Sequence, residues 1–181
     1  ALILQGKNTI FETDLFAPLV DSVLSKSKVT KANLKTATRD ARIIADHVRA
    51  LSFAIAEGAL PGNEGAGYVL RRLLRRAVTR GRSEQGLALD GAFLADAAAR
   101  AIDAFGGHYT ELATHRERIL KLLEQEEASF GQTYEAGMER LEKLLAQGFT
   151  ELPGHEAFTL HDTYGFPFEL TEEIAASRNI T

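Results

Sequence analysis

The sequence predicts an all-α fold, a helical bundle with one long helix or a helical hairpin in its C-terminal half. Apolar residues recur at steps of three and four along most of the chain. Gly, Asn and Thr occur where these periodic segments end, and no proline interrupts residues 62–152. With 181 residues, 45% of them hydrophobic, the chain is long enough for a packed core. We therefore expect a single helical domain over residues 1–181.

Four helices are predicted in the first part of the chain, over residues 12–25, 37–57, 68–81 and 90–105. Thr13 is the expected N-cap of the first helix. Gly58 is expected to end the second, and Gly106 to end the fourth. A loop with three glycines separates the second helix from the third, and glycine allows backbone conformations that are closed to other residues.

Residues 110–147 keep an apolar period throughout, which predicts either one long bent helix or a helical hairpin. Glu124, Glu126 and Glu127 crowd its middle and are expected on a solvated face, while Gly131 and Gly137 weaken the helix. A turn at residues 153–154 leads to a short segment over 156–162, a sharp corner at 164–167 and a last helix to about residue 177.

Composition excludes several classes of protein. The chain has no Cys, which excludes disulfides, thiol catalysis and Cys-ligated zinc and fits a reducing compartment, so we expect a cytoplasmic location. No apolar run approaches the roughly 20 residues of a membrane span, and the N-terminus lacks the pattern of a signal peptide. Because the first residue is Ala, we expect a fragment of a longer protein.

Charge is distributed unevenly along the chain. Residues 1–83 carry 14 Lys or Arg against 7 Asp or Glu, whereas residues 84–181 carry 7 against 18. The net charge of −4 hides this difference. A basic first half indicates a polyanionic partner.

The strongest local pattern alternates pairs of arginines with pairs of apolar residues in the helix expected over 68–81. Four arginines form one face of that helix, here called the arginine face: Arg71, Arg72, Arg75 and Arg76. Arg80 and Arg82 extend it. A planar guanidinium suits phosphate, so this face predicts contacts to a nucleic-acid backbone. The alternative is a non-catalytic interaction module whose arginine face docks an acidic protein surface or the acidic second half.

The other sequence patterns give weaker indications of function. The glycine loop lacks the Lys-Ser/Thr of a phosphate-binding loop, and no strand precedes it. His47 is expected to be a core histidine with a satisfied ring nitrogen. The spacing of His155, His161 and Asp162 matches no metal-ligand pattern, and no arrangement predicts catalysis. We therefore expect neither a metal site nor catalytic residues.

Several blocks together resemble the alanyl-tRNA synthetase family. These are Arg42-Ile43-Ile44-Ala45-Asp46-His47-Val48-Arg49, Pro61-Gly62-Asn63-Glu64, the helix from Gly67-Tyr68 to Ala77, and Asp162-Thr163-Tyr164-Gly165-Phe166-Pro167. Their order and spacing match that family. Glu12-Thr13-Asp14-Leu15-Phe16 fits the segment that precedes them, so the resemblance covers nearly the whole chain.

The resemblance implies the helical tRNA-recognition domain between a class II catalytic domain and a zinc-binding editing domain, with residues 1–25 as the connection from the catalytic domain. None of the three class II motifs that bind ATP and the amino acid is present. ATP and zinc are therefore expected only in the full-length ligase, and the fragment alone should be inactive. The expected partners are the acceptor stem of tRNA(Ala) and the catalytic and editing domains of the same chain.

The resemblance also implies two base-reading residues. The family reads a G·U wobble pair with an Asn and an Asp, which match Asn63 and Asp162. Such a pair leaves the guanine amino group free in the shallow minor groove of A-form RNA. A carboxylate accepts from that donor, and an amide both donates and accepts. Residues 84–150 show little similarity to the family's blocks, so no roles are assigned to them.

Overall fold

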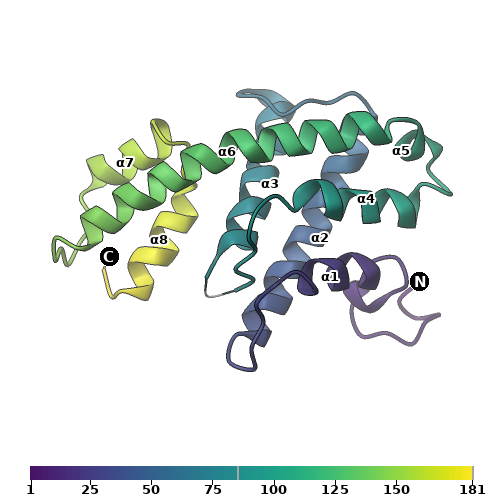
Figure 1. Ribbon diagram of the computed structural model, residues 1–181, viewed down its shortest axis with the longest axis horizontal. Helices are drawn as coiled ribbons and strands as arrows, with labels where there is room; N and C mark the ends of the chain where they lie inside the picture. Colours follow the sequence, from purple (N-terminus) through teal and green to yellow (C-terminus); the bar gives the residue numbers. More distant parts are fainter. Residues whose placement is uncertain (85, 181) are drawn as a thin grey trace. The chain divides into compact units, whose positions relative to one another are not determined.

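The computed structural model describes residues 1–84 and 86–180 (Figure 1). Its elements are η1 (Ile10–Glu12), α1 (Ala17–Leu24), α2 (Leu34–Ala56), α3 (Gly65–Arg82), α4 (Leu94–Phe105), α5 (Thr110–Thr114), α6 (Arg116–Leu145), α7 (Gly154–Asp162) and α8 (Phe168–Ser177). No strand occurs in the described residues, which confirms the predicted all-α class.

The chain divides into two compact units, Ala1–Glu127 and Ala128–Thr181. The sequence predicts one recognition domain over residues 1–181, and that expectation stays a prediction. None of the helices in the described part of the chain is long and apolar enough to cross a membrane.

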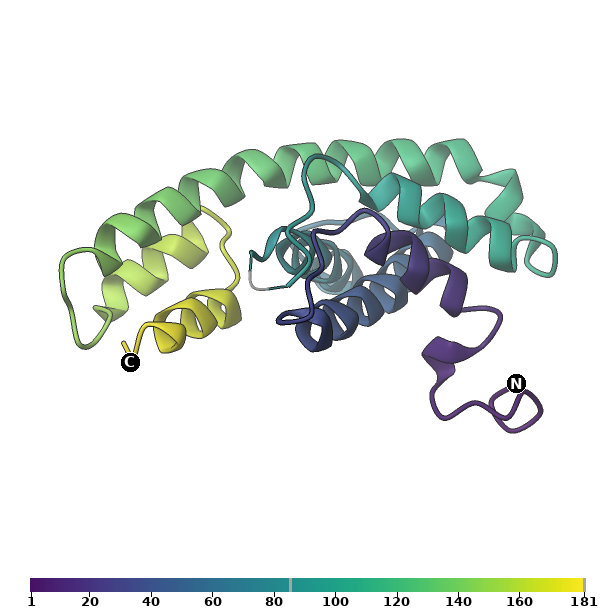
Figure 2. The same cartoon turned by 60° about the horizontal axis from the view of Figure 1, so that its bottom comes forward.

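In the first unit, α2 is the central helix and packs against α1, α3, α4 and α5 (Figures 1 and 2). Its core side chains recur at helical spacing and are fully or almost fully buried: Ala37, Ala41, Ile44, Ala45, Val48, Leu51 and Ile55. The first helix also contributes to this core, because Leu19, Val20 and Val23 of α1 are buried. Residues 17–24 are thus built into the first unit.

Local sequence signals predict the end of α2 correctly and the start of α1 incorrectly. Gly58 has φ +93°, and its N–H donates to Ile55 O while the N–H of Ala59 donates to Ala54 O. This is the Schellman arrangement that a glycine after the last helical residue predicts. The expected N-cap at Thr13 is wrong, since α1 begins at Ala17 and Thr13 closes η1 by donating to Ile10 O.

From the sequence, residues 110–147 are expected to form either one long bent helix or a helical hairpin. They form the short α5 followed by the single long α6. In the second unit, the C-terminal part of α6 lies beside α7 in both views (Figures 1 and 2), and α7 packs against α8. Phe166 is fully buried and stacks on Tyr134 of α6. A Cβ at Gly137 would lie 2.7 Å from the Phe166 ring, so the glycine permits this close contact.

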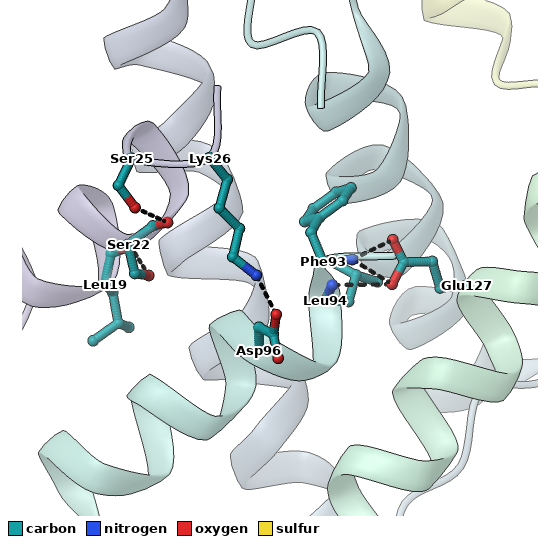
Figure 3. A network of polar contacts seen from close by, with 8 residues as sticks. All are labelled: Leu19, Ser22, Ser25, Lys26, Phe93, Leu94, Asp96 and Glu127. Atoms are coloured by element: carbon teal, nitrogen blue, oxygen red, sulfur yellow. Dashed lines mark hydrogen bonds and ion pairs between the residues drawn. The ribbon is translucent and has the colours of Figure 1, made fainter. Parts of the chain in front are cut away.

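Glu127 corrects the expectation that the acidic run of α6 is solvated throughout. Its side chain is buried, and its carboxylate accepts hydrogen bonds from the backbone N–H groups of Phe93 (3.1 Å) and Leu94 (2.9 Å), as Figure 3 shows. These N–H groups begin α4 and have no partner within that helix. Burial raises the pKa of Glu127, and the two backbone donors partly oppose that shift.

Candidate nucleic-acid interface

The loop before α3 is closed on itself by glycine contacts. The N–H of Gly62 donates to Gly67 O at 2.9 Å. A Cβ at Gly67 would lie 2.8 Å from Leu60 O, which leaves room only for glycine there. Gly65 has φ +53° and begins the helix three residues earlier than the sequence predicts. This geometry places Asn63 and Glu64 on the outside, where both are exposed.

Asn63 has a defined partner in this loop. The guanidinium of Arg71, two turns into α3, donates from Nη1 to Oδ1 of Asn63. The Arg71 Nε lies 3.9 Å from a carboxylate oxygen of Glu126 on α6. About a quarter of each of these two charged side chains is exposed, at 25% and 27%. Glu126, Arg71 and Asn63 therefore form one polar chain that runs from α6 to the loop.

The arginine face consists of two kinds of residue. Arg72 and Arg76 are exposed, and neither has a hydrogen-bond or ion-pair partner in the described part of the chain. Arg71 and Arg75 are half-buried. Burial lowers the pKa of Arg75, the charge of Arg71 lowers it further, and Glu126 raises it. Only part of this face is thus free to receive an anion.

The expected extension of the arginine face turns toward the protein at Arg80. Its guanidinium lies 3.9 Å from the carboxylate of Asp40, a fully buried residue of α2. The apolar side of α3 also differs from the sequence pattern, since Val69 is 54% exposed while Leu70, Leu74, Ala77 and Val78 are buried. Exposed Tyr68 and Val69 accompany Asn63 at the start of α3.

His47 lies on α2, and the electrostatic field of Arg76 reaches it. Burial lowers the pKa of His47, Arg76 lowers it further, and Asp46, whose carboxylate is 3.8 Å from Nδ1, raises it. Of the two ring nitrogens, Nδ1 faces the Asp46 carboxylate, whereas Nε2 is buried without a hydrogen-bond partner in the described residues. Burial and the charge of Arg76 thus favour the neutral form of the imidazole.

Asp162 belongs to the second unit, whereas Asn63 belongs to the first. It is the last residue of α7 and is exposed, with no hydrogen-bond partner among the described residues. The corner that follows is held by its backbone: Gly165 has φ +58°, and the N–H of Phe166 donates to Leu160 O at 2.9 Å. The carboxylate is therefore available to a ligand rather than used as a cap.

The described residues contain no group of three or more His, Cys, Asp or Glu side chains that could hold a metal ion. A hollow of about 460 Å³ lies in the second unit between α6 and α7. An ion pair between Arg140 and Glu156, 2.6 Å apart, lies at its edge. Glu156 also lies 3.8 Å from Nε2 of His155, so its carboxylate faces two basic side chains.

Comparison with known proteins places the whole chain in one family. The family described as tRNA synthetases class II (A) matches residues 1–181. The chain belongs to this family. The class II tRNA synthetase assignment rests on the full length of the chain and not on the arginine face alone.

Relatives with high similarity to this chain include alanine–tRNA ligases. The ligase of Roseiflexus sp. (strain RS-1) is 42% identical over 185 residues, and that of Chloroflexus aurantiacus is 43% identical over 186 residues, each covering 100% of this chain. The ligase of Streptococcus pyogenes serotype M4 is 46% identical over 184 residues, or 97% of this chain. The chain spans 20% of the length of each relative. The resemblance to the alanyl-tRNA synthetase family is confirmed.

Asn63, Asp162 and the arginine face are candidates from the sequence, and their roles stay predictions, whereas the contacts of Glu126 and Glu127 are not expected from it. Both glutamates belong to an acidic run that resembles a solvated helix face. Their partners are 55 and 33–34 positions away in sequence, at Arg71 and at the start of α4. No local pattern signals such contacts.

Proposed function

We propose that this chain is the region of an alanine–tRNA ligase that recognises the acceptor stem of tRNA(Ala). Asn63 and Asp162 read the G·U wobble pair, and the arginine face holds the RNA backbone through Arg72 and Arg76. The observation that carries the proposal is the exposed Asn63 on a closed loop at the start of α3. The same helix presents Arg72 and Arg76, which are exposed and have no side-chain partner among the described residues. The names of the relatives support the choice of tRNA and amino acid.

The division of labour follows from the chemistry of the groups. Guanidinium contacts to phosphate fix position on the duplex but are nearly blind to sequence. The exposed Asp162 carboxylate only accepts hydrogen bonds, so it distinguishes a stem with a free guanine amino group from one in which that group is paired. Activation of alanine, with its ATP, and editing, with its zinc, belong to other parts of the full-length ligase in the cytoplasm.

The test compares G·U and G·C acceptor stems in the full-length ligase that contains this chain. Asp162→Ala and Asn63→Ala should each lower kcat/KM for the G·U stem, which corresponds to a loss of about 1–3 kcal/mol in transition-state stabilisation. The kcat/KM for the G·C stem should stay nearly unchanged. Glu151→Ala is the matched control, since Glu151 is another exposed carboxylate of the second unit. Equal losses on both stems for Asp162→Ala would make Asp162 a structural residue and end its role as a reader.

A second experiment separates this proposal from a protein-docking face. The proposal expects salt-sensitive binding to tRNA that heparin competes with poorly at equal phosphate or sulfate concentration. A docking face for acidic protein surfaces would bind heparin and tRNA alike. Equal binding of heparin and tRNA would therefore favour the interaction-module alternative.

A further inference from the structure

Arg71 differs from the other residues of the arginine face in what its guanidinium touches. Nη1 donates to the side-chain oxygen of Asn63, and Nε faces the Glu126 carboxylate at 3.9 Å. Its neighbour Arg72 is exposed and without a partner in the described part of the chain. Arg71 and Arg72 are adjacent on the same helix, but the Arg71 guanidinium contacts protein groups whereas the Arg72 side chain is exposed.

We propose that Arg71 is a positioning residue that orients Asn63, with Glu126 holding Arg71 in place, and that it is not a contact to the RNA backbone. This inference rests on the proposed function, because it assigns a role within the site that reads the base pair. It changes the expectation that all four arginines of the face bind phosphate.

An exposed asparagine needs such a partner to read a base edge. Its amide is nearly symmetric in shape, and rotation by half a turn exchanges the donor and the acceptor. A charged donor fixed against Oδ1 selects one of these two orientations, because the reversed amide would bring an NH₂ group against a cation. The closed loop holds the backbone of Asn63, and among the described residues only Arg71 bonds its side chain.

Glu126 holds the Arg71 side chain in place. Arg71 and Arg75 are one helical turn apart, and the charge of Arg71 lowers the pKa of Arg75 while Glu126 raises it. The carboxylate thus offsets the repulsion that would drive Arg71 outward into solvent. A guanidinium that is occupied by an amide and a carboxylate does not replace counterions on an RNA phosphate, so it contributes little to the salt dependence of tRNA binding.

The test uses the full-length ligase and two independent measurements: the ratio of kcat/KM on G·U over G·C stems, and the slope of log K against log salt for tRNA binding. Arg71→Ala should lower the ratio roughly tenfold and leave the slope unchanged. Arg72→Ala, the matched control on the next residue, should flatten the slope by about 0.7–0.9 and leave the ratio unchanged.

Two further variants keep the inference testable if Arg71→Ala melts early. Arg71→Lys retains the positive charge but loses the planar fork, so it should lower the ratio with an unchanged slope. Glu126→Gln should lower the ratio less than Arg71→Ala does. In the Asn63→Ala background, Arg71→Ala should lower the ratio no further, because the group that it positions is gone.

The outcomes distinguish this inference from the proposed function. A flatter slope for Arg71→Ala, with an unchanged ratio, would make Arg71 a phosphate contact and overturn the inference while the reading role of Asn63 stands. Additive losses in Asn63→Ala/Arg71→Ala would also overturn it, since Arg71 would then act elsewhere. An unchanged ratio in Asn63→Ala itself would instead overturn the proposed function.

Discussion

Glu127 is a carboxylate that serves a helix other than its own. The N–H groups of Phe93 and Leu94 open α4, and Glu127 of α6 accepts from both. Unsatisfied donors at a buried helix start are costly, and the partial positive charge there favours an anion. This explains why a charged residue is only 1% exposed in the core of the first unit.

Glu127→Ala should destabilise the chain, because it leaves two buried N–H groups without an acceptor. We expect a loss of about 1–3 kcal/mol in the free energy of unfolding, measured by urea denaturation at pH 7. Glu124→Ala is the control, as Glu124 is exposed on the same helix, and its effect should stay within roughly 0.5 kcal/mol. Equal midpoints for the two variants would contradict the capping role.

The residue scale also shows where prediction from sequence ends. Asn63 and Asp162 stand in distinctive blocks, so the resemblance predicts a reading role for them, and both side chains are exposed. Glu126 and Glu127 stand beside Glu124 in one acidic run, and only the tertiary positions of α3 and α4 give them different partners. Burial and pairing of such residues depend on distant segments and cannot be derived from local periodicity.

At the scale of elements, the long α6 has two glycines in its interior, Gly131 and Gly137, and Gly137 has a defined packing role. Glycine at such a position normally weakens a helix by about 1 kcal/mol relative to alanine. Here Gly137 lies against the fully buried Phe166, whose ring would be 2.7 Å from an added Cβ. The same residue that reduces helix propensity thus permits the packing of the corner after α7.

Gly137→Ala should destabilise the second unit despite the gain in helix propensity. Overpacking against Phe166 costs about 1–3 kcal/mol, which exceeds the roughly 1 kcal/mol gained. Faster hydrogen exchange of amides in α7 and α8 is the measurement. Gly154→Ala, with open space around its position, serves as the control in the same unit. Slower exchange in Gly137→Ala would show that the ring moves aside without cost.

Helix existence and order are predictable from the sequence, whereas the helix starts are less so. The period of α2 and the glycine after it suffice to predict its core face and its end. The start of α1 is missed because Thr13 is a good N-cap type but is used to close η1. Periodicity alone leaves one helix and a hairpin equally open for residues 110–147, since the apolar spacing is the same in both.

At the scale of the whole molecule, the chain is a fifth of its relatives in length and lacks the class II motifs that bind ATP. The chain alone should therefore show ATP–pyrophosphate exchange with alanine at background level. The full-length ligase, assayed in parallel, is the positive control. Exchange above background from the 181-residue chain would overturn the assignment of activation to the rest of the enzyme.

The self-closed loop between α2 and α3 has a consequence for the thermodynamics of recognition. A flexible loop would lose conformational entropy when it meets its ligand, and affinity would fall accordingly. The Gly62–Gly67 hydrogen bond and the Schellman end at Gly58 impose that loss during folding instead. Binding of RNA at this loop should therefore cause little change in the loop's conformation. Discrimination between acceptor stems should appear mainly as faster dissociation of the wrong stem.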